Sequence, residues 1–150
     1  DEENELVKKY GLKSKREIWK TLAKVNYFRR RAKALAKSTL EEQEVLFKKL
    51  QEIGLDIKSI ADVLALTVEA LLERRPQTVV FRKGLANTPN HARQLVTHKK
   101  VSLNGKIINK PSYLVPVAIE DSIKIKLPEK KAAPLKADTP LDSVEQEVTA

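Results

Sequence analysis

The stretch from residue 84 to residue 111 constrains the fold more than any other part of the chain, because it carries the signals for a helix followed at once by a hairpin. Thr88 is a good helix N-cap, and Pro89 takes the first helical position, where a missing N–H costs nothing. After the helix, Asn104-Gly105 separates two short apolar runs, and both residues tolerate the positive φ of a two-residue turn. The stretch predicts a helix joined to a small antiparallel ribbon.

This part of the chain is also cationic and free of acids. No Asp or Glu occurs between Arg74 and Ile119. The basic residues of the same stretch are Arg74, Arg75, Arg82, Lys83, Arg93, Lys99, Lys100, Lys106 and Lys110. A folded unit with cations and no anions indicates a polyanionic partner.

A second basic surface is expected on a long helix over residues 15–37. Ser14 and Glu17 form a capping-box pattern at its start. Its apolar stripe would consist of Ile18, Leu22, Val25, Phe28, Ala32 and Leu35. The cations expected to contact the polyanionic partner from this helix are Lys15, Arg16, Lys20, Arg29, Arg30, Arg31 and Lys33. A merely solvated face is the alternative, but Glu17 is the only acid between Leu6 and Leu40, and uncompensated like charges on one helix repel.

The segments around these two surfaces read as scaffold. A short helix is expected over residues 4–10 and ends at Gly11, and further helices are expected over 41–53, 59–66, 67–74 and 76–83. Their starting signals are a capping box at residues 38–41 and N-caps at Ser59 and Thr67. Residues 41–73 carry eight acids against three lysines, so this block should face away from RNA or toward another protein. Residues 122–126 read as a strand that pairs with the hairpin.

Composition limits the class of protein further. The net charge of +9 and the pI of about 9.7 favour nucleic acid or an anionic membrane as partner. No apolar run approaches the ~18 residues of a membrane-spanning helix, so no membrane partner is expected. The absence of cysteine fits a reducing, cytoplasmic compartment and removes thiolate metal sites. The absence of methionine leads us to expect that the natural chain begins before Asp1.

The sequence offers no catalytic constellation, and no enzymatic activity is expected. It has no phosphate-binding loop, no dinucleotide fingerprint and no zinc-protease motif. His91 and His98 lie seven residues apart on one helix face, but a metal site needs more ligands than two. We therefore expect no metal, no cofactor and no small-molecule substrate.

Motifs in both parts of the chain resemble one family. Arg74-Arg75, Gly84, the run from Ala92 to Val96, His98 and the run from Val101 to Lys106 resemble the RNA-binding module of the S-four family of small-subunit ribosomal proteins. Upstream, Tyr10-Gly11-Leu12, residues 15–20 and Phe28-Arg29-Arg30-Arg31-Ala32 are similar to the helical first domain of that family. The resemblance covers residues 5–127 and is nearest to the archaeal and eukaryotic branch, with an archaeal source favoured.

The resemblance implies a function and a set of contacts. It implies a structural protein of the ribosome that binds ribosomal RNA at a multi-helix junction of the 5′ domain, supports subunit assembly, and borders neighbouring ribosomal proteins and the path by which mRNA enters. The RNA contacts carried over from the family are Arg74, Arg75, Arg82, Lys83, Asn87, His91, Arg93, Gln94, His98, Lys99, Lys100 and Lys106.

The chain departs from the family pattern at three places. Gln77 stands where many members have Asp, and Pro89-Asn90-His91 replaces a helix start that contains Ser and Arg. Lys99 stands where a glycine usually ends the helix. Either Lys99 adopts a positive φ, which is unfavourable for this residue type, or the turn has a different shape.

The predicted fold class is α+β, a mostly helical scaffold with an RNA-binding module of one α-helix and a small antiparallel β-ribbon. We expect a helical scaffold domain over residues 1–73, the module over 74–127 and a flexible tail over 128–150, where apolar groups are scarce. Two other functions fit the same residues. One is the RNA-binding module of an RNA-modifying enzyme or tRNA ligase, and the other is a protein-interaction scaffold that uses the acidic helices.

Overall fold

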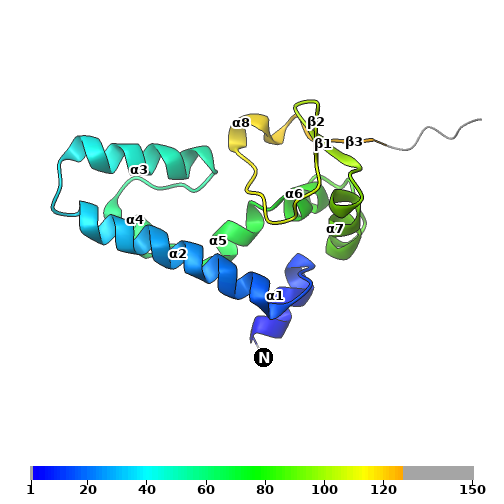
Figure 1. The fold of residues 1–150 in the computed structure, drawn as a ribbon, viewed down its shortest axis with the longest axis horizontal. Helices are drawn as coiled ribbons and strands as arrows, with labels where there is room; N and C mark the ends of the chain where they lie inside the picture. Colours follow the sequence, from blue (N-terminus) through cyan, green and yellow to red (C-terminus); the bar gives the residue numbers. More distant parts are fainter. Residues whose placement is uncertain (1, 127–150) are drawn as a thin grey trace, which may run out of the picture.

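The computed structural model describes residues 2–126 and has two parts side by side, an elongated helical part and a smaller mixed part (Figure 1). The predicted tail over residues 128–150 lies outside the described residues. In chain order the elements are α1 (Glu2–Tyr10), α2 (Lys15–Leu35), α3 (Leu40–Glu52), α4 (Ile60–Leu64), α5 (Val68–Glu73), α6 (Pro76–Arg82), α7 (Pro89–Thr97), β1 (Val101–Leu103), β2 (Lys106–Ile108), α8 (Val117–Glu120) and β3 (Lys124–Ile125). The predicted α+β class, helical with a small antiparallel sheet, is confirmed.

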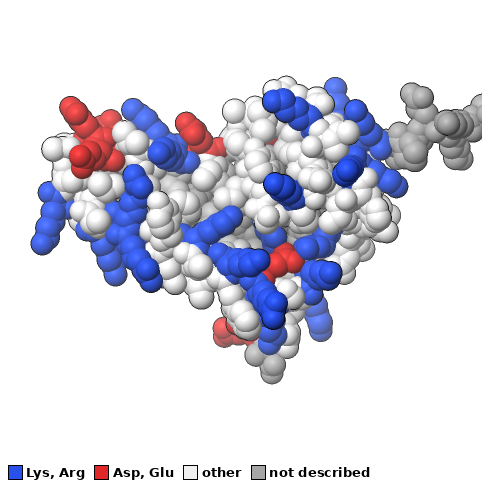
Figure 2. Space-filling model, in the orientation of Figure 1, with Lys and Arg blue, Asp and Glu red and all other residues white. Residues whose placement is uncertain are grey.

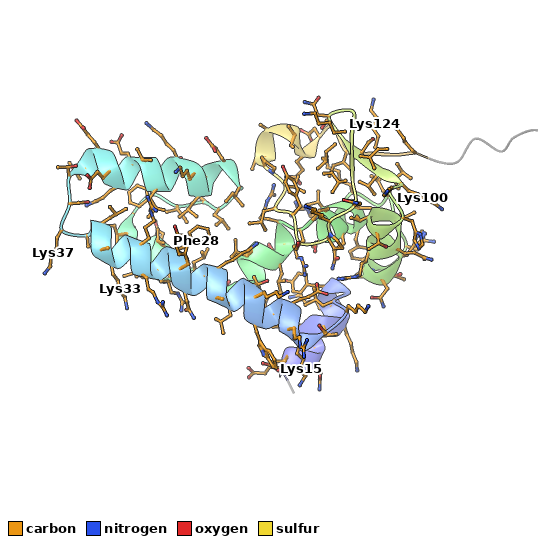
Figure 3. The ribbon with its side chains drawn as sticks, in the orientation of Figure 1. Lys15, Phe28, Lys33, Lys37, Lys100 and Lys124 are labelled. Carbon is orange, nitrogen blue, oxygen red and sulfur yellow. The ribbon has the colours of Figure 1, made fainter. Side chains whose placement is uncertain are left out.

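The helical part is organised around α2. This helix lies alongside α3, and α4 and α5 pack against it as well (Figure 1). Val25 and Ala32 of α2 are fully buried against Leu50 of α3 and Leu71 of α5. Phe28 points into the space between α2 and α3, whereas the labelled Lys33 and Lys37 point away from it (Figure 3). The predicted apolar stripe of α2 therefore faces the core as expected, although Leu22 of that stripe is 41% exposed.

The mixed part has its own core. Helices α6 and α7 pack together and against a three-stranded antiparallel sheet of order β2-β1-β3. The predicted hairpin is confirmed, with Val101 opposite Ile108 and with Asn104 and Gly105 at φ values of 47° and 79°. The side chain of Thr88 accepts a hydrogen bond from the backbone N–H of His91, so the predicted N-cap is confirmed too.

A buried polar contact and a close backbone approach join the two parts. Gln77 of α6 is fully buried, and its Nε2 donates to the carbonyl oxygens of Tyr10, at 2.5 Å, and Gly11, at 3.2 Å. A carboxylate at this position could donate to neither carbonyl. Gly11 has a φ of +60°, and a Cβ there would lie 2.7 Å from the backbone of Pro89. The end of α1 therefore sits directly on the start of α7.

Several boundary predictions were wrong. The predicted capping boxes at residues 14–17 and 38–41 do not form, because Glu17 binds arginines instead and the hydroxyl of Ser38 donates back to the carbonyl of Leu35. The long helix ends at Leu35 rather than at residue 37. Helix α8 was not predicted, since two prolines bracket the residues before it. The caps at Ser59 and Thr67 do form.

The division of the chain at residue 73 stays a prediction. One group of buried core residues runs from Val25 to Leu71 and another from Val79 to Ile123, which agrees with two parts. Leu114, however, packs against the first group although it follows the proposed boundary.

Gly11 provides a test of how tightly the two parts are joined. We expect Gly11→Ala to lower the free energy of unfolding by about 2–4 kcal/mol, because the new methyl group meets backbone that cannot rotate away and the residue keeps a positive φ. Gly84→Ala is the matched control: Gly84 has a φ of +72° but nothing within 4 Å, so only the strain of about 1 kcal/mol should appear. Urea unfolding of both variants measures the difference, and equal losses would contradict the close approach.

Candidate nucleic-acid interface

The carboxylate of Glu17, in the first turn of α2, binds two arginines of the mixed part. Its Oε2 lies 2.8 Å from Nη1 of Arg75, and Arg93 donates from Nη1 to Oε2 at 3.0 Å and from Nη2 to Oε1 at 2.9 Å. Arg75 also donates from Nε to the carbonyl oxygen of Pro111 at 2.9 Å. We call Glu17, Arg75 and Arg93 the Glu17 node. It links α2 to the start of α6 and to α7.

The Glu17 node stabilises the charged form of its carboxyl group. Burial alone would raise the pKa of Glu17, but the hydrogen bond from Arg93 and the charge of Arg75 outweigh it and hold the pKa below the ordinary value of 4.5. The Glu17 side chain is only 17% exposed. The ion pairs of the Glu17 node are therefore shielded from solvent more than an ordinary surface ion pair is.

Glu120, at the end of α8, forms a second node. Its Oε2 lies 2.9 Å from Nη2 of Arg74, and its Oε1 lies 2.6 Å from Nη2 of Arg82. Arg74 also donates to the carbonyl oxygen of Val115 at 2.8 Å. Gly54 is needed beside it, because a Cβ at that position would lie 2.8 Å from the Arg74 guanidinium. These contacts hold α8 against α6 within the mixed part.

Five of the predicted RNA-binding side chains are not exposed at the surface and have partners inside the protein. Arg74 and Arg75 are 7% and 5% exposed, and Arg93 turns toward α2 rather than to solvent. Arg29 donates to the carbonyl oxygen of Leu66 at 2.7 Å, and Lys83 donates to the carbonyl oxygen of Glu120 at 2.5 Å. RNA contact by these five stays a prediction. The structure gives them a role in joining helices that the charge pattern did not indicate.

The other predicted residues lie at the surface in two groups. The first, which we call the α2 surface, consists of Lys15, Arg16, Lys20, Arg30, Arg31 and Lys33. The second, which we call the module surface, consists of Asn87, His91, Gln94, His98, Lys99, Lys100 and Lys106, on α7 and the segments that flank it. Arg82 is also exposed but is paired with Glu120.

Charge is unevenly distributed over the visible face. Figure 2 shows Lys and Arg along the diagonal of α2 and over the mixed part, whereas Asp and Glu gather most densely around α3. Glu17, the one acid of α2, and Glu120, which follows the acid-free stretch, are both engaged with arginines. Apart from Lys15, which lies beside Glu3, the exposed cations of the two surfaces form no salt bridge with an acid among residues 2–126.

A hollow of about 220 Å³ lies between the two parts. Its lining residues are Glu17, Lys20, Thr21, Lys24, Arg75, Arg93, Pro111, Ser112 and Leu114. Four cations against one carboxylate make it suited to an anionic group. It joins the α2 surface to the mixed part.

The end of α7 resolves the alternative that the sequence left open at Lys99. Lys99 has a φ of 59°, so it occupies the left-handed region that glycine usually fills. The N–H of Lys100 donates to the carbonyl oxygen of Leu95 at 3.0 Å, and that of Lys99 donates to Val96 at 3.1 Å. This is the Schellman pattern of helix termination. It leaves Lys99 and Lys100 exposed side by side at the module surface.

Six further exposed cations, on α2 or next to it in the sequence and in the mixed part, are not on the predicted list. They are Lys13, Lys24, Lys37, Lys110, Lys124 and Lys126. The helical periodicity of residues 15–37 already puts Lys24 and Lys37 on the polar flanks of α2. Lys124 could have been found from the alternation of isoleucine and lysine in the last strand.

Other kinds of site were searched for among residues 2–126. No group of three or more His, Asp or Glu side chains there could hold a metal ion. None of the helices in that range combines the length and the apolar character needed to cross a membrane.

Comparison with known proteins gives concordant results. Residues 74–118 match the family model described as the S4 domain. The small ribosomal subunit protein uS4 of Methanococcus aeolicus is 50% identical over 129 residues, which cover 81% of this chain and 73% of that protein. The proteins of the same name from Ignicoccus hospitalis and Halobacterium salinarum are 46% and 42% identical, covering 76% and 81% of this chain and 72% and 74% of their own lengths. The resemblance inferred from the motifs is confirmed, and these relatives come from archaea.

Glu17→Gln tests the Glu17 node. The folded-state pKa of Glu17 is depressed, so the node stabilises the protein above the ordinary pKa of 4.5, and this contribution is lost as the pH falls through the folded-state value. We expect the variant to lose about 1–3 kcal/mol at neutral pH, because two guanidinium groups lose a buried partner. We also expect its stability to fall less steeply than that of the wild type as the solution is acidified.

Unfolding by urea at several pH values makes the measurement. Glu41→Gln, at an exposed position at the start of α3, is the control and should follow the wild type. Parallel pH profiles for wild type and Glu17→Gln would show that the node contributes nothing.

Proposed function

Because this chain belongs to the uS4 family of small ribosomal subunit proteins, we propose that it is a structural component of that subunit in the cytoplasmic ribosome and binds ribosomal RNA directly. The observation that supports this most strongly is the pair of exposed cationic surfaces, together with the internal pairing of Glu17, the one acid of α2, and of Glu120, the acid that follows the acid-free stretch. When surfaces of this kind bind the phosphates of a nucleic acid, they release the counterions that were condensed on it. The role requires no catalytic group, and we propose that the chain is not an enzyme.

The geometry supports a protein that holds two RNA segments at once. The α2 surface and the module surface lie on different elements, and the Glu17 node fixes α2 relative to α7. RNA duplexes display little sequence to side chains, so a protein that recognises a junction depends on phosphate contacts at defined distances. We propose that the two surfaces bind different helices of a junction in the 5′ domain of the small-subunit RNA and so support assembly of the subunit.

The acidic helix α3 fits a different partner. Glu41, Glu42, Glu44 and Glu52 are exposed there, and negative side chains are repelled by phosphates. We propose that this side faces solvent or a neighbouring ribosomal protein. We further propose, on the family resemblance alone, that the bound protein lies near the path by which mRNA enters the subunit.

Charge reversal on α2 tests the two-surface proposal. We expect Arg30→Glu, Arg31→Glu and Lys33→Glu combined to weaken binding to a 5′-domain transcript by more than ~100-fold, and to reduce the slope of log affinity against log salt by ~2–3, since about three phosphate contacts are lost. Filter binding over a series of salt concentrations measures both.

The matched control is Lys48→Glu with Lys49→Glu on α3, which adds negative charge away from both surfaces. It should shift the affinity little and leave the slope unchanged. If the control and the α2 variant lower affinity equally, only net charge matters and the assignment of the α2 surface is wrong.

Lys99→Gly tests whether Lys99 lowers the stability of the fold while it contributes to RNA affinity. Glycine adopts a φ of 59° without strain, so we expect the variant to be more stable by about 1 kcal/mol. We expect its RNA affinity to fall, because a cation leaves the module surface. Urea unfolding and filter binding are measured on the same preparation, and a gain in stability without any loss of affinity would show that Lys99 does not contact RNA.

A further inference from the structure

The exposed face of α2 carries two aromatic rings that lie outside the hydrophobic core. Trp19 is 53% exposed and Tyr27 is 56% exposed, whereas the core side of the same helix is formed by Ile18, Val25 and Ala32. Trp19 is the only tryptophan of the chain. Burying a large ring stabilises a protein, so rings left half in water among cations call for another partner.

Helix geometry puts the two rings on either side of a small residue. Ala23 follows Trp19 by four residues and precedes Tyr27 by four, so the three side chains lie on successive turns of one exposed face. Each turn advances the chain by ~5.4 Å. The two rings are therefore eight residues, or ~12 Å, apart along the helix, and the exposed Ala23 between them carries only a methyl group, so that a flat group can stack on either ring. We call Trp19, Ala23 and Tyr27 the aromatic gap.

Both rings are held by their edges. The indole Nε1 of Trp19 donates to Oε1 of Glu3 at 3.0 Å. The hydroxyl of Tyr27 accepts from Nη1 of Arg31 at 3.3 Å, and its ring packs edge-to-face with Phe28 at 5.7 Å. Rings restrained in this way lose less conformational freedom when a ligand stacks on them.

The charge around the aromatic gap favours an anionic ligand. Lys20, Lys24 and Arg30 are exposed on the neighbouring positions of α2. The nearby carboxylate of Glu3 is accompanied by Lys15, whose Nζ lies 3.5 Å away. A flat apolar group with a negative charge attached is the chemistry of a nucleotide, whose base stacks while its phosphate meets the lysines.

We propose that the aromatic gap binds unpaired nucleobases of the RNA. A base inside a duplex is already stacked and cannot reach the rings, so the site selects single-stranded or bulged nucleotides. This inference rests on the proposed RNA-binding function and adds what part of the RNA the α2 surface recognises. It assigns α2 a role beyond phosphate contact.

Trp19 itself reports on the site. Stacking of a base changes the emission of an indole, and no other tryptophan contributes to the signal. We expect the emission of the full chain to be quenched by short single-stranded oligouridine and by the 5′-domain transcript. A fully paired RNA duplex of the same length as the oligouridine should bind in a salt-dependent way and leave the emission unchanged. Equal quenching by the duplex would overturn the proposal.

Variants at Tyr27 give a second measurement. Tyr27→Leu should weaken binding of the 5′-domain transcript by ~5- to 100-fold, which is the range found for removal of one stacking ring. Tyr27→Phe keeps the ring and should bind nearly as the wild type does. Tyr113→Leu removes a tyrosine that is 42% exposed but lies outside α2, and it should have little effect.

The outcomes separate this inference from the function on which it rests. If the wild type binds none of the RNAs, the proposed function fails and the aromatic gap fails with it. If the wild type binds with the expected salt dependence but Trp19 emission stays constant and Tyr27→Leu keeps full affinity, only the aromatic gap is wrong. Rings that served a protein partner instead would give this second result.

Discussion

The contact between Glu17 and the two arginines Arg75 and Arg93 determines how the two parts of this protein sit against each other. Glu17 belongs to α2, Arg75 caps α6, and Arg93 lies on α7, so one carboxylate fixes three helices. A buried ion pair adds little net stability, because desolvation offsets much of the attraction, but it strongly disfavours arrangements that leave a charge alone. Here that specificity sets the distance between two cationic surfaces. A protein that binds two RNA helices needs such a fixed distance more than it needs extra stability.

The Glu17 node also explains how a basic protein can fold without repelling itself. Arg75 is neutralised where little solvent screens it, and the Glu120 node does the same for Arg74, whereas Arg82 of that node stays 48% exposed. The remaining cations lie at the surface, where water screens their mutual repulsion. Acids are therefore placed where the fold requires them and are scarce where RNA is proposed to bind. The pI of about 9.7 reflects this arrangement rather than a uniformly basic surface.

Features that depend on neighbouring residues could be predicted from the sequence, and those that depend on distant ones could not. The cap at Thr88 and the turn at Asn104-Gly105 are set by residues within three positions, and both occur as expected. The direction of Arg93 depends on Glu17, which lies 76 positions earlier in the chain. A helical pattern places Arg93 on the polar arc of α7 but cannot show that another helix covers that arc. For the same reason the sequence did not indicate the internal partners of Arg74, Arg75 and Arg93.

In the mixed part the arginines pair with carboxylates, and the lysines, apart from Lys83, are exposed. Arg74, Arg75, Arg82 and Arg93 all bind carboxylates, whereas Lys99, Lys100, Lys106 and Lys110 are exposed. Guanidinium is planar, weakly hydrated and able to fork onto a carboxylate, so it is suited to buried pairs, whereas the ammonium group of lysine is compact and strongly hydrated and is costly to remove from water. Replacement of a surface lysine by arginine keeps the positive charge that RNA would meet. Replacement of an arginine by lysine in the Glu17 node or the Glu120 node keeps the positive charge but loses the guanidinium geometry that joins the helices.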